Sequence, residues 1–391
     1  MNSRLRIIVL GYIVRGPLGG MAWHHLQYVL GLARLGHDVY FLEDSDDYPS
    51  CYDPQRHVTD TDPTYGLGFT KRAFDWIGMA RRWAYYDAHK RRWLGPCAEQ
   101  TASLCETAEL LINLSGINPL RPWFLQIPHR VLLDTDPVFT QIRHLTDSKA
   151  RAQASRHTCF FSFGENVAGV DGQIPDDGFA WRATRQPIVL EAWSQTPPVP
   201  QGFYTTVMQW DSYQSILYKG QQFGMKSTSF ESFLDLPGKT PVTLELALGS
   251  EHAPRKLLKA QGWRMRDPLV VTSTLGTYQR YLQGSKAEFS VAKHGYVVSR
   301  SGWFSERSAC YLATGRPVIV QDTGFTDNIE TGRGLFAFNN LDQAITAIAE
   351  VEVNYTKHCS AAREVARYYF EAGKVLTRLI AVVFAQGSSN N

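Results

Sequence analysis

The sequence has few cysteines and no long apolar run, and each absence argues against a class of protein. Its 391 residues include only 6 cysteines, none in a Cys-x-x-Cys pair, which argues against a disulfide framework or a zinc site. No stretch approaches the roughly 18 apolar residues that a spanning helix needs. The 40 Lys and Arg nearly balance the 37 Asp and Glu, so charge alone does not call for a polyanionic partner. We expect a cytoplasmic protein.

What the sequence does contain is the pattern of an α/β protein. Leu5–Tyr12 predicts a buried strand, Gly16–Gly20 a glycine-rich loop, Trp23–Leu35 a helix and Val39–Leu42 a second strand. Strands joined by helices through short connections imply a parallel, doubly wound sheet. Three later apolar runs, at 110–114, 130–133 and 159–163, also turn polar at their C-terminal ends. In open α/β sheets that end faces the ligand.

The chain divides into two such series. The proline-rich segment 195–200 separates the first series from a second one, and a long helix is predicted near 361–380. We therefore expect a first domain at 1–195 and a second at 196–365. The segment 366–391 should form a helix that packs back on the first domain and ends in a frayed tail.

The first candidate site follows the opening strand. The glycines Gly19 and Gly20 leave room for a ligand, and backbone N–H groups at a helix start favour an anion. His24 and His25 follow, and a histidine is a base near neutral pH. We expect His24 to line the loop mouth and His25 to pack toward the sheet. The alternative is a purely structural pair. Two acidic residues at strand ends, Asp136 and Glu165, are further candidates for the base or for acceptor contacts.

The second candidate site is the segment Ser299–Ser308. Ser305 is a good N-cap, and the free N–H groups behind it point toward an anion. Arg300 and Arg307 carry forked donors suited to phosphate oxygens, and Glu306 is able to accept sugar hydroxyls. With the turn Ser301-Gly302, the segment predicts a diphosphate site. The alternative is a capped helix with surface Arg–Glu pairs. No His, Cys, Asp or Glu cluster has metal-ligand spacing, so we expect no metal.

Three passages resemble the GT-B superfamily of nucleotide-sugar glycosyltransferases. Gly36-His37-Asp38-Val39 is similar to their turn into the second strand. Ser301–Ser305 resembles the donor motif His-Cys-Gly-Trp-Asn-Ser, with Gly302, Trp303 and Ser305 matching. Gly315-Arg316-Pro317-Val318, with Asp322-Thr323-Gly324, resembles a segment of the glycogen-synthase-like enzymes, and Cys310 stands where those have a second glutamate.

The resemblance implies two facing Rossmann-type parallel-sheet domains with a cleft between them. It further implies metal-independent transfer of a sugar from a nucleotide-diphosphate sugar, with UDP favoured, to an unidentified acceptor and without a cofactor. The first domain would hold the acceptor and the second the donor. Two alternatives stay open: another GT-B-fold enzyme such as a sugar-nucleotide epimerase, and a non-catalytic protein that binds nucleotide sugars or polymers.

The segment 71–92 carries seven Lys and Arg interleaved with Trp, Tyr and Phe, and we interpret it as a helix. Such a helix suits anionic lipid headgroups, which would make the protein peripheral to a membrane. It also suits a lipid-linked glycan, a phosphate-bearing small molecule or a nucleic acid as acceptor. The alternative is a solvated helix whose aromatic side chains belong to the core.

Overall fold

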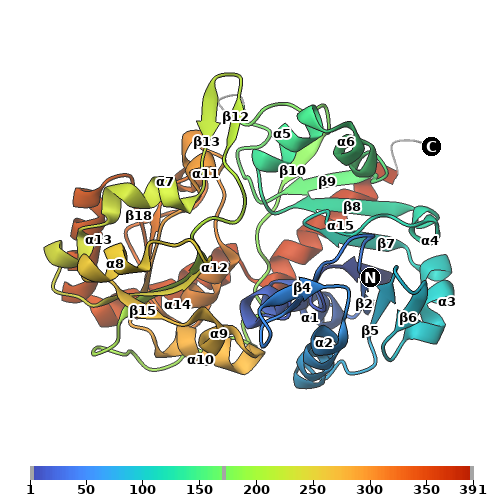
Figure 1. The fold of residues 1–391 in the computed structure, drawn as a ribbon, viewed down its shortest axis with the longest axis horizontal. Helices are drawn as coiled ribbons and strands as arrows, with labels where there is room; N and C mark the ends of the chain where they lie inside the picture. Colours follow the sequence, from blue (N-terminus) through green and yellow to red (C-terminus); the bar gives the residue numbers. More distant parts are fainter. Residues whose placement is uncertain (1–3, 170–172, 388–391) are drawn as a thin grey trace.

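The computed structural model describes residues 4–169 and 173–387 and shows two α/β halves side by side (Figure 1). The first half is built on an eight-stranded sheet in the order β10-β9-β8-β7-β1-β2-β5-β6, parallel except for the β5–β6 pair. Its strands are β1 Arg6–Leu10, β2 Asp38–Asp44, β5 Trp83–Asp87, β6 Arg92–Leu94, β7 Leu110–Leu114, β8 His129–Asp134, β9 Cys159–Ser162 and β10 Trp181–Ala183. A separate hairpin pairs β3 Cys51–Asp53 with β4 Val58–Asp60.

The second half contains a six-stranded parallel sheet in the order β15-β14-β11-β16-β17-β18. Its strands are β11 Tyr204–Gln209, β14 Leu244–Gly249, β15 Arg264–Arg266, β16 Ala287–Ser290, β17 Val318–Gln321 and β18 Leu335–Phe338. A hairpin of β12 Ile216–Tyr218 and β13 Gln221–Phe223 projects beside the first half (Figure 1). The α/β prediction with two parallel-sheet halves is confirmed.

Helices flank both sheets. In the first half they are α1 Gly19–Arg34, α2 Thr64–Trp76, α3 Thr101–Thr107, α4 Pro122–Leu125, α5 Phe139–Thr146 and α6 Ser148–Ala154. The second half has α7 Lys226–Phe230, α8 Arg255–Ala260, α9 Pro268–Thr272, α10 Leu275–Gly284, α11 His294–Val298, α12 Glu306–Ala313, α13 Leu341–Val353 and α14 Tyr355–Tyr369. Short 3-10 turns lie at Ala98–Gln100, Glu231–Phe233, Leu236–Lys239 and Phe325–Asp327. Within the described part of the chain, no helix combines the length and apolar character needed to cross a membrane.

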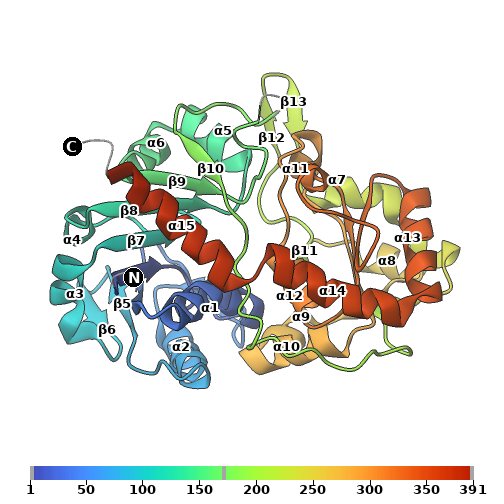
Figure 2. The same cartoon turned by 180° about the vertical axis from the view of Figure 1, so that it is seen from behind.

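The last helix returns to the first half. The predicted single helix at 361–380 is instead two helices, α14 and α15 Ala372–Gly387, separated at Phe370 and Glu371. At this break the backbone pairs with the connecting segment, since Ile188 donates its N–H to Phe370 O at 2.6 Å. Helix α15 then packs against α1, as Figure 2 shows from behind. A Cβ at Gly31 of α1 would lie 2.6 Å from Leu376 Cδ1, so the glycine permits this close packing.

The prediction of a helix over 71–92 was wrong beyond Trp76. Helix α2 ends at Trp76, where Gly78 adopts a left-handed φ of +72°, and the chain then forms the edge strands β5 and β6. Burial of Trp83 and Tyr85, which lie in strand β5, accounts for part of the aromatic content. The basic residues of the segment therefore do not share one helical face.

Two short apolar runs of the second half, which resemble strands in sequence, are helical in the structure. The run 269–272 forms helix α9, which Asp267 caps by accepting the N–H of Leu269 at 2.9 Å and which starts with Pro268. The run 296–299 falls largely in helix α11. In α9 the cap by Asp267 and the proline at the first helical position outweigh the strand preference of valine.

One apolar core runs through both halves. It joins Trp23 of α1, Trp193 of the connecting segment and Tyr278 of α10. The Trp23 and Trp193 rings lie 5.1 Å apart, and Trp23 Nε1 donates to Leu275 O at 3.2 Å. Contacts between α1 and α10 thus link the two halves and set the position of one sheet relative to the other.

Candidate active site

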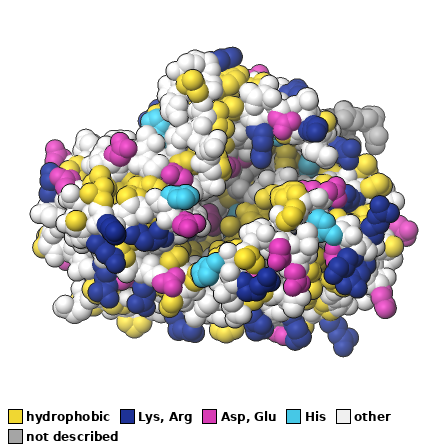
Figure 3. Space-filling view, in the orientation of Figure 1, with side chains coloured by type: hydrophobic (Ala, Val, Ile, Leu, Met, Phe, Trp, Pro, Cys, Tyr) yellow, Lys and Arg dark blue, Asp and Glu magenta, His cyan; other side chains and the backbone are white. Residues whose placement is uncertain are grey.

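The carboxyl ends of both sheets open into one cleft of about 1240 Å³. Figure 3 shows this hollow between the halves, bordered by histidine and acidic side chains. Its wall on the first half includes Tyr12 after β1 and Asp136 after β8. Its wall on the second half includes Gln209 at the end of β11, Ser250 after β14 and Lys293 after β16. This is where an open α/β sheet places its ligand.

The N-terminus of α12 faces the cleft. Ser305 caps the helix by accepting the N–H of Arg307 at 3.2 Å, as predicted, and Ser305, Glu306 and Arg307 all line the cleft. Free N–H groups in this first turn favour an anion. Helix α12 therefore starts where the sequence predicts, and its first turn lies beside the cleft.

Arg307 is fixed by three hydrogen bonds. Its Nε donates to Glu288 Oε1 at 2.6 Å, one Nη donates to Val207 O at 2.8 Å and the other donates to Ser290 Oγ at 2.8 Å. Glu288 is fully buried, so this ion pair is shielded from water. An arginine carries five N–H donors, which leaves two for a ligand.

Lys226 is a cleft residue that sequence reasoning missed. It begins α7, lines the cleft and forms no ion pair within the described part of the chain. Burial, and after it the nearby Arg307 charge, lower the pKa of Lys226 to about 7. No sequence pattern marks this lysine, because only the fold brings it into the same cleft as Arg307.

The two histidines have different surroundings. His24 lines the cleft, and burial lowers its pKa while Glu306 opposes that shift. His25 is fully buried: its Nε2 accepts the N–H of Tyr12 at 3.2 Å, so its Nδ1 is the donor to Met21 O at 2.7 Å. Both nitrogens of His25 are thus occupied by the backbone, whereas His24 faces the space where a substrate would lie.

The first turn of α1 is a contact between the halves. Helix α1 begins at Gly19, so Gly19 and Gly20 belong to the helix rather than to a loop. A Cβ at Gly19 would lie 2.3 Å from Thr274 O, and one at Gly20 would lie 2.9 Å from the Tyr278 ring. Gly20 also lines the cleft. The structure explains both glycines by close packing against α10, where the sequence suggested room for a ligand.

Asp136 joins the two halves across the cleft. Its carboxylate accepts hydrogen bonds from Lys293 Nζ at 2.8 Å and from the hydroxyl groups of Tyr213 and Tyr296. All three donors come from the second half. Trp303 makes a further link, since its Nε1 donates to Thr135 O at 3.2 Å and its ring stacks on Tyr296.

Solved structures provide the comparison. An α-glucosyltransferase in complex with UDP matches with a TM-score of 0.58 and 10% identity over 97% of this chain and 100% of the other. The same type of enzyme has been solved with UDP and a 13-mer DNA. HepE of Anabaena, in complex with UDP-glucose, matches with a TM-score of 0.57 and 12% identity over 98% and 100%. AviGT4, a glycosyltransferase involved in avilamycin A biosynthesis, matches with a TM-score of 0.52, 12% identity and 97% coverage of each chain.

The chain has the GT-B fold. No protein-family model matches it, and no curated protein matches its sequence. The likeness is therefore one of architecture, and it extends over nearly the whole length of each neighbour.

Within this GT-B fold, the predicted donor segment is split between two places. Arg300 lies outside the residues that line the cleft, is half exposed and pairs with Asp327 at 3.0 Å. Ser301 is buried, and its carbonyl accepts the N–H of Asn166 at 3.2 Å. Gly302 has a φ of +75°, and a Cβ there would lie 2.9 Å from Asn166 N.

Glu165 likewise stands apart from the cleft lining and accepts two hydrogen bonds from Arg185, at 2.7 and 2.8 Å. The segment 300–302 and residues 165–166 thus form a contact between the halves. Only Ser305, Glu306 and Arg307 of the predicted donor set reach the cleft.

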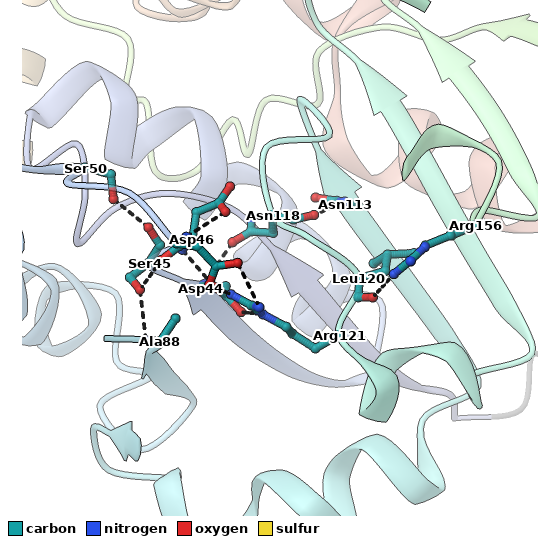
Figure 4. Close-up of polar contacts among 11 residues, drawn as sticks. Asp44, Ser45, Asp46, Ser50, Ala88, Asn113, Asn118, Leu120, Arg121 and Arg156 are labelled. Atoms are coloured by element: carbon teal, nitrogen blue, oxygen red, sulfur yellow. Dashed lines mark hydrogen bonds and ion pairs between the residues drawn. The ribbon is translucent and has the colours of Figure 1, made fainter. Parts of the chain in front are cut away.

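Polar groups at the end of β2 support the first half instead of entering the cleft (Figure 4). Arg121 donates two hydrogen bonds to Asp44, at 2.9 and 3.1 Å, and Asn118 links Asp44 N to Gly11 O. The carboxylate of Glu43 accepts the N–H groups of Ile13, Val14 and Arg15, each at 2.7 Å. These contacts fix the loop after β1, which carries Tyr12 into the cleft. Among the described residues, no group of three or more His, Cys, Asp or Glu is arranged to hold a metal ion.

Proposed function

We propose that the chain is a glycosyltransferase that takes its sugar from UDP-sugar. The observation that carries the proposal is that Lys226, Arg307 and His24 line one cleft together with the N-terminus of α12. The neighbours of the same fold that were solved with UDP or UDP-glucose support a nucleotide of this kind.

In this proposal the second half holds the donor. The diphosphate lies at the N-terminus of α12, where helix N–H groups and Lys226 supply positive charge and Arg307, paired with Glu288, offers its two remaining N–H donors. Glu306, beside this turn, accepts hydroxyl groups of the sugar. Transfer breaks the bond between the sugar and the diphosphate, and the same cations stabilise the charge that develops on the leaving diphosphate. No metal is needed for that role, so we expect metal-independent activity.

His24 is the proposed base on the acceptor side. Its lowered pKa keeps the ring neutral at pH 7, which leaves a nitrogen able to accept the proton of an acceptor hydroxyl. Tyr52 and His57 of the β3–β4 hairpin line the same cleft and would meet the acceptor. We propose a hydroxyl group as the acceptor function, whether it belongs to a small molecule, a lipid-linked glycan or a nucleic acid.

Calorimetric titration with UDP tests the donor site. A charge-assisted hydrogen bond contributes about 1.5–3 kcal/mol, so Lys226→Met should weaken UDP binding by roughly 10-fold to 150-fold. Arg300→Ala is the matched control, because it also removes one cation from the second half but lies outside the cleft lining. Equal UDP affinity in the wild-type protein and Lys226→Met would refute the donor site.

Turnover of UDP-glucose tests the base. His24→Ala should lose about 10²–10⁴-fold in turnover while UDP affinity is retained. Product that forms without any acceptor would favour an epimerase instead, and UDP binding without turnover of any donor would favour a non-catalytic binding protein.

A further inference from the structure

The second half contains another hollow, of about 380 Å³, that is separate from the cleft. Helices α9 and α10 contribute to both: Leu269 and Tyr278 line the cleft, whereas Val271 and Tyr281 line this hollow. Its volume falls within the range of about 300–1,000 Å³ that is typical of small-molecule sites. Nothing in the proposed transfer reaction uses it.

The floor of the hollow is polar although it lies in the middle of a parallel sheet. Thr205 on β11 is in register with Glu245 on β14 and with Glu288 on β16, and each of the three is less than 5% exposed. Interior strands of parallel sheets are normally apolar, because burial of polar groups is costly. The burial of Glu288 is accounted for by its ion pair with Arg307 of the cleft. Thr205 and Glu245 line the hollow instead.

The polar floor is held in place by its neighbours. Glu245 accepts hydrogen bonds from Arg264 Nε at 2.6 Å and from the Tyr281 hydroxyl at 3.0 Å. The Thr205 hydroxyl lies 2.6 Å from Ser285 Oγ and 2.7 Å from the Tyr311 hydroxyl. The hydroxyl and carboxylate groups thus form a fixed surface, and the charge of Glu245 is already offset by Arg264.

Two arginines without an acidic partner complete the hollow. Arg266 and Arg280 both line it, both are exposed, and neither forms an ion pair within residues 4–169 and 173–387. Figure 3 shows Lys and Arg side chains gathered over α8 and β15, the strand that ends at Arg266. Since Arg264 balances Glu245, these two guanidinium groups leave the hollow with a net positive charge.

We propose that this hollow is a second ligand site, which binds a small phosphate monoester such as a sugar phosphate. Guanidinium forks match phosphate oxygens, so Arg266 and Arg280 hold the phosphate group. The hydroxyl groups of the ligand meet the polar floor at Thr205 and Glu245. The inference goes beyond the proposed transfer reaction and does not depend on it.

Titration with glucose 1-phosphate tests this site in the full-length chain, with UDP present in excess to occupy the cleft. The double variant Arg266→Ala/Arg280→Ala removes both cations of the hollow. Its matched control, Lys256→Ala/Lys259→Ala, removes two exposed cations from neighbouring α8 that do not line the hollow. UDP affinity is measured on the same samples, so a failure of the donor-site proposal is seen there and separately.

The expected result is glucose 1-phosphate binding that weakens at least about 10-fold in the arginine variant and less than about 3-fold in the lysine control. Melting temperatures of the two variants should be similar, since all four side chains are exposed. No binding by the wild-type protein at millimolar concentration, or equal weakening in both variants, would overturn the proposal.

Discussion

Replacing Asp136 with asparagine should shift the molecule toward a more open arrangement of its two halves. The carboxylate of Asp136 belongs to the first half and accepts hydrogen bonds from Lys293, Tyr213 and Tyr296 of the second. Asparagine has almost the same shape but no charge, and its amide nitrogen cannot accept a hydrogen bond. The substitution therefore weakens all three contacts with little change in packing.

The size of the effect follows from the burial of the contact. Hydrogen bonds to charged groups contribute about 1.5–3 kcal/mol each. The side chains of Lys293 and Asp136 are 13% and 28% exposed, so solvent screens the ion pair in part. Since asparagine retains some hydrogen bonding, we expect a net loss of about 2 kcal/mol for the closed arrangement. That corresponds to a roughly 30-fold change in the ratio of closed to open molecules.

Energy transfer between two dyes measures this change. Glu106→Cys in α3 and Lys256→Cys in α8 give one exposed attachment site on each half, and the six native cysteines are buried. Asp136→Asn should lengthen the mean distance between the dyes. The control is Asp75→Asn, which removes an exposed ion pair with Lys71, also at 2.8 Å but within α2, and should leave the distance unchanged.

An unchanged distance distribution in Asp136→Asn would refute the reasoning. A second check is the combination with Lys293→Met. Because the two side chains share one contact, the effects of the single substitutions should add to more than the effect of the double variant. Strict additivity would show that the ion pair does not hold the halves together.

Three further predictions concern single residues, and a fourth concerns metal ions. Gly19→Ala should lower the melting temperature because its Cβ would lie 2.3 Å from Thr274 O, whereas Gly238→Ala, with nothing within 4 Å of its Cβ, should not; equal melting would contradict this. His25→Ala should cost about 1–3 kcal/mol in the free energy of unfolding, because the backbone groups of Tyr12 and Met21 lose their buried partner, and an unchanged denaturant midpoint would argue against it. Lys226, with a pKa of about 7 in the free protein, should be held protonated by a bound diphosphate, so UDP affinity should fall as pH rises from 7 to 9, and Lys226→Met should flatten that dependence. Transferase activity should persist in excess chelator, and its loss with recovery on adding Mg²⁺ would contradict the metal-independent mechanism.

Local patterns in the sequence were sufficient for much of the fold. The opening strand and helix, the parallel sheets of both halves and the cap at Ser305 were all predictable, because each depends on periodicity or on a few neighbouring residues. Prediction failed over 71–92, where the left-handed turn at Gly78 and pairing of β5 with β2 replaced the expected helix. The local sequence carries little information about which distant segments pair as strands.

The candidate site shows the same division. Sequence reasoning alone placed Glu306 and Arg307 at a helix start beside a ligand crevice, since capping is local. Only the tertiary structure separated Arg300, which pairs with Asp327, from Arg307, which faces the cleft. Helical spacing correctly favoured His24 over His25 as the one beside the cleft, but the backbone contacts of His25 depend on the loop after β1.

Neither the place of Lys226 in the cleft nor the hollow lined by α9 and α10 could be predicted from the sequence, because both depend on the tertiary structure. Lys226 has a lowered pKa because the fold buries it and brings it near Arg307, which lies 81 positions away along the chain. Thr205 and Glu245 share one floor because β11 and β14 pair in parallel register. The sequence by itself thus determined most of the strands and helices and the capped start of α12. The packing of distant segments decided which charges are buried, which are paired and which face a ligand, because electrostatic environment depends on distance in space and not along the chain.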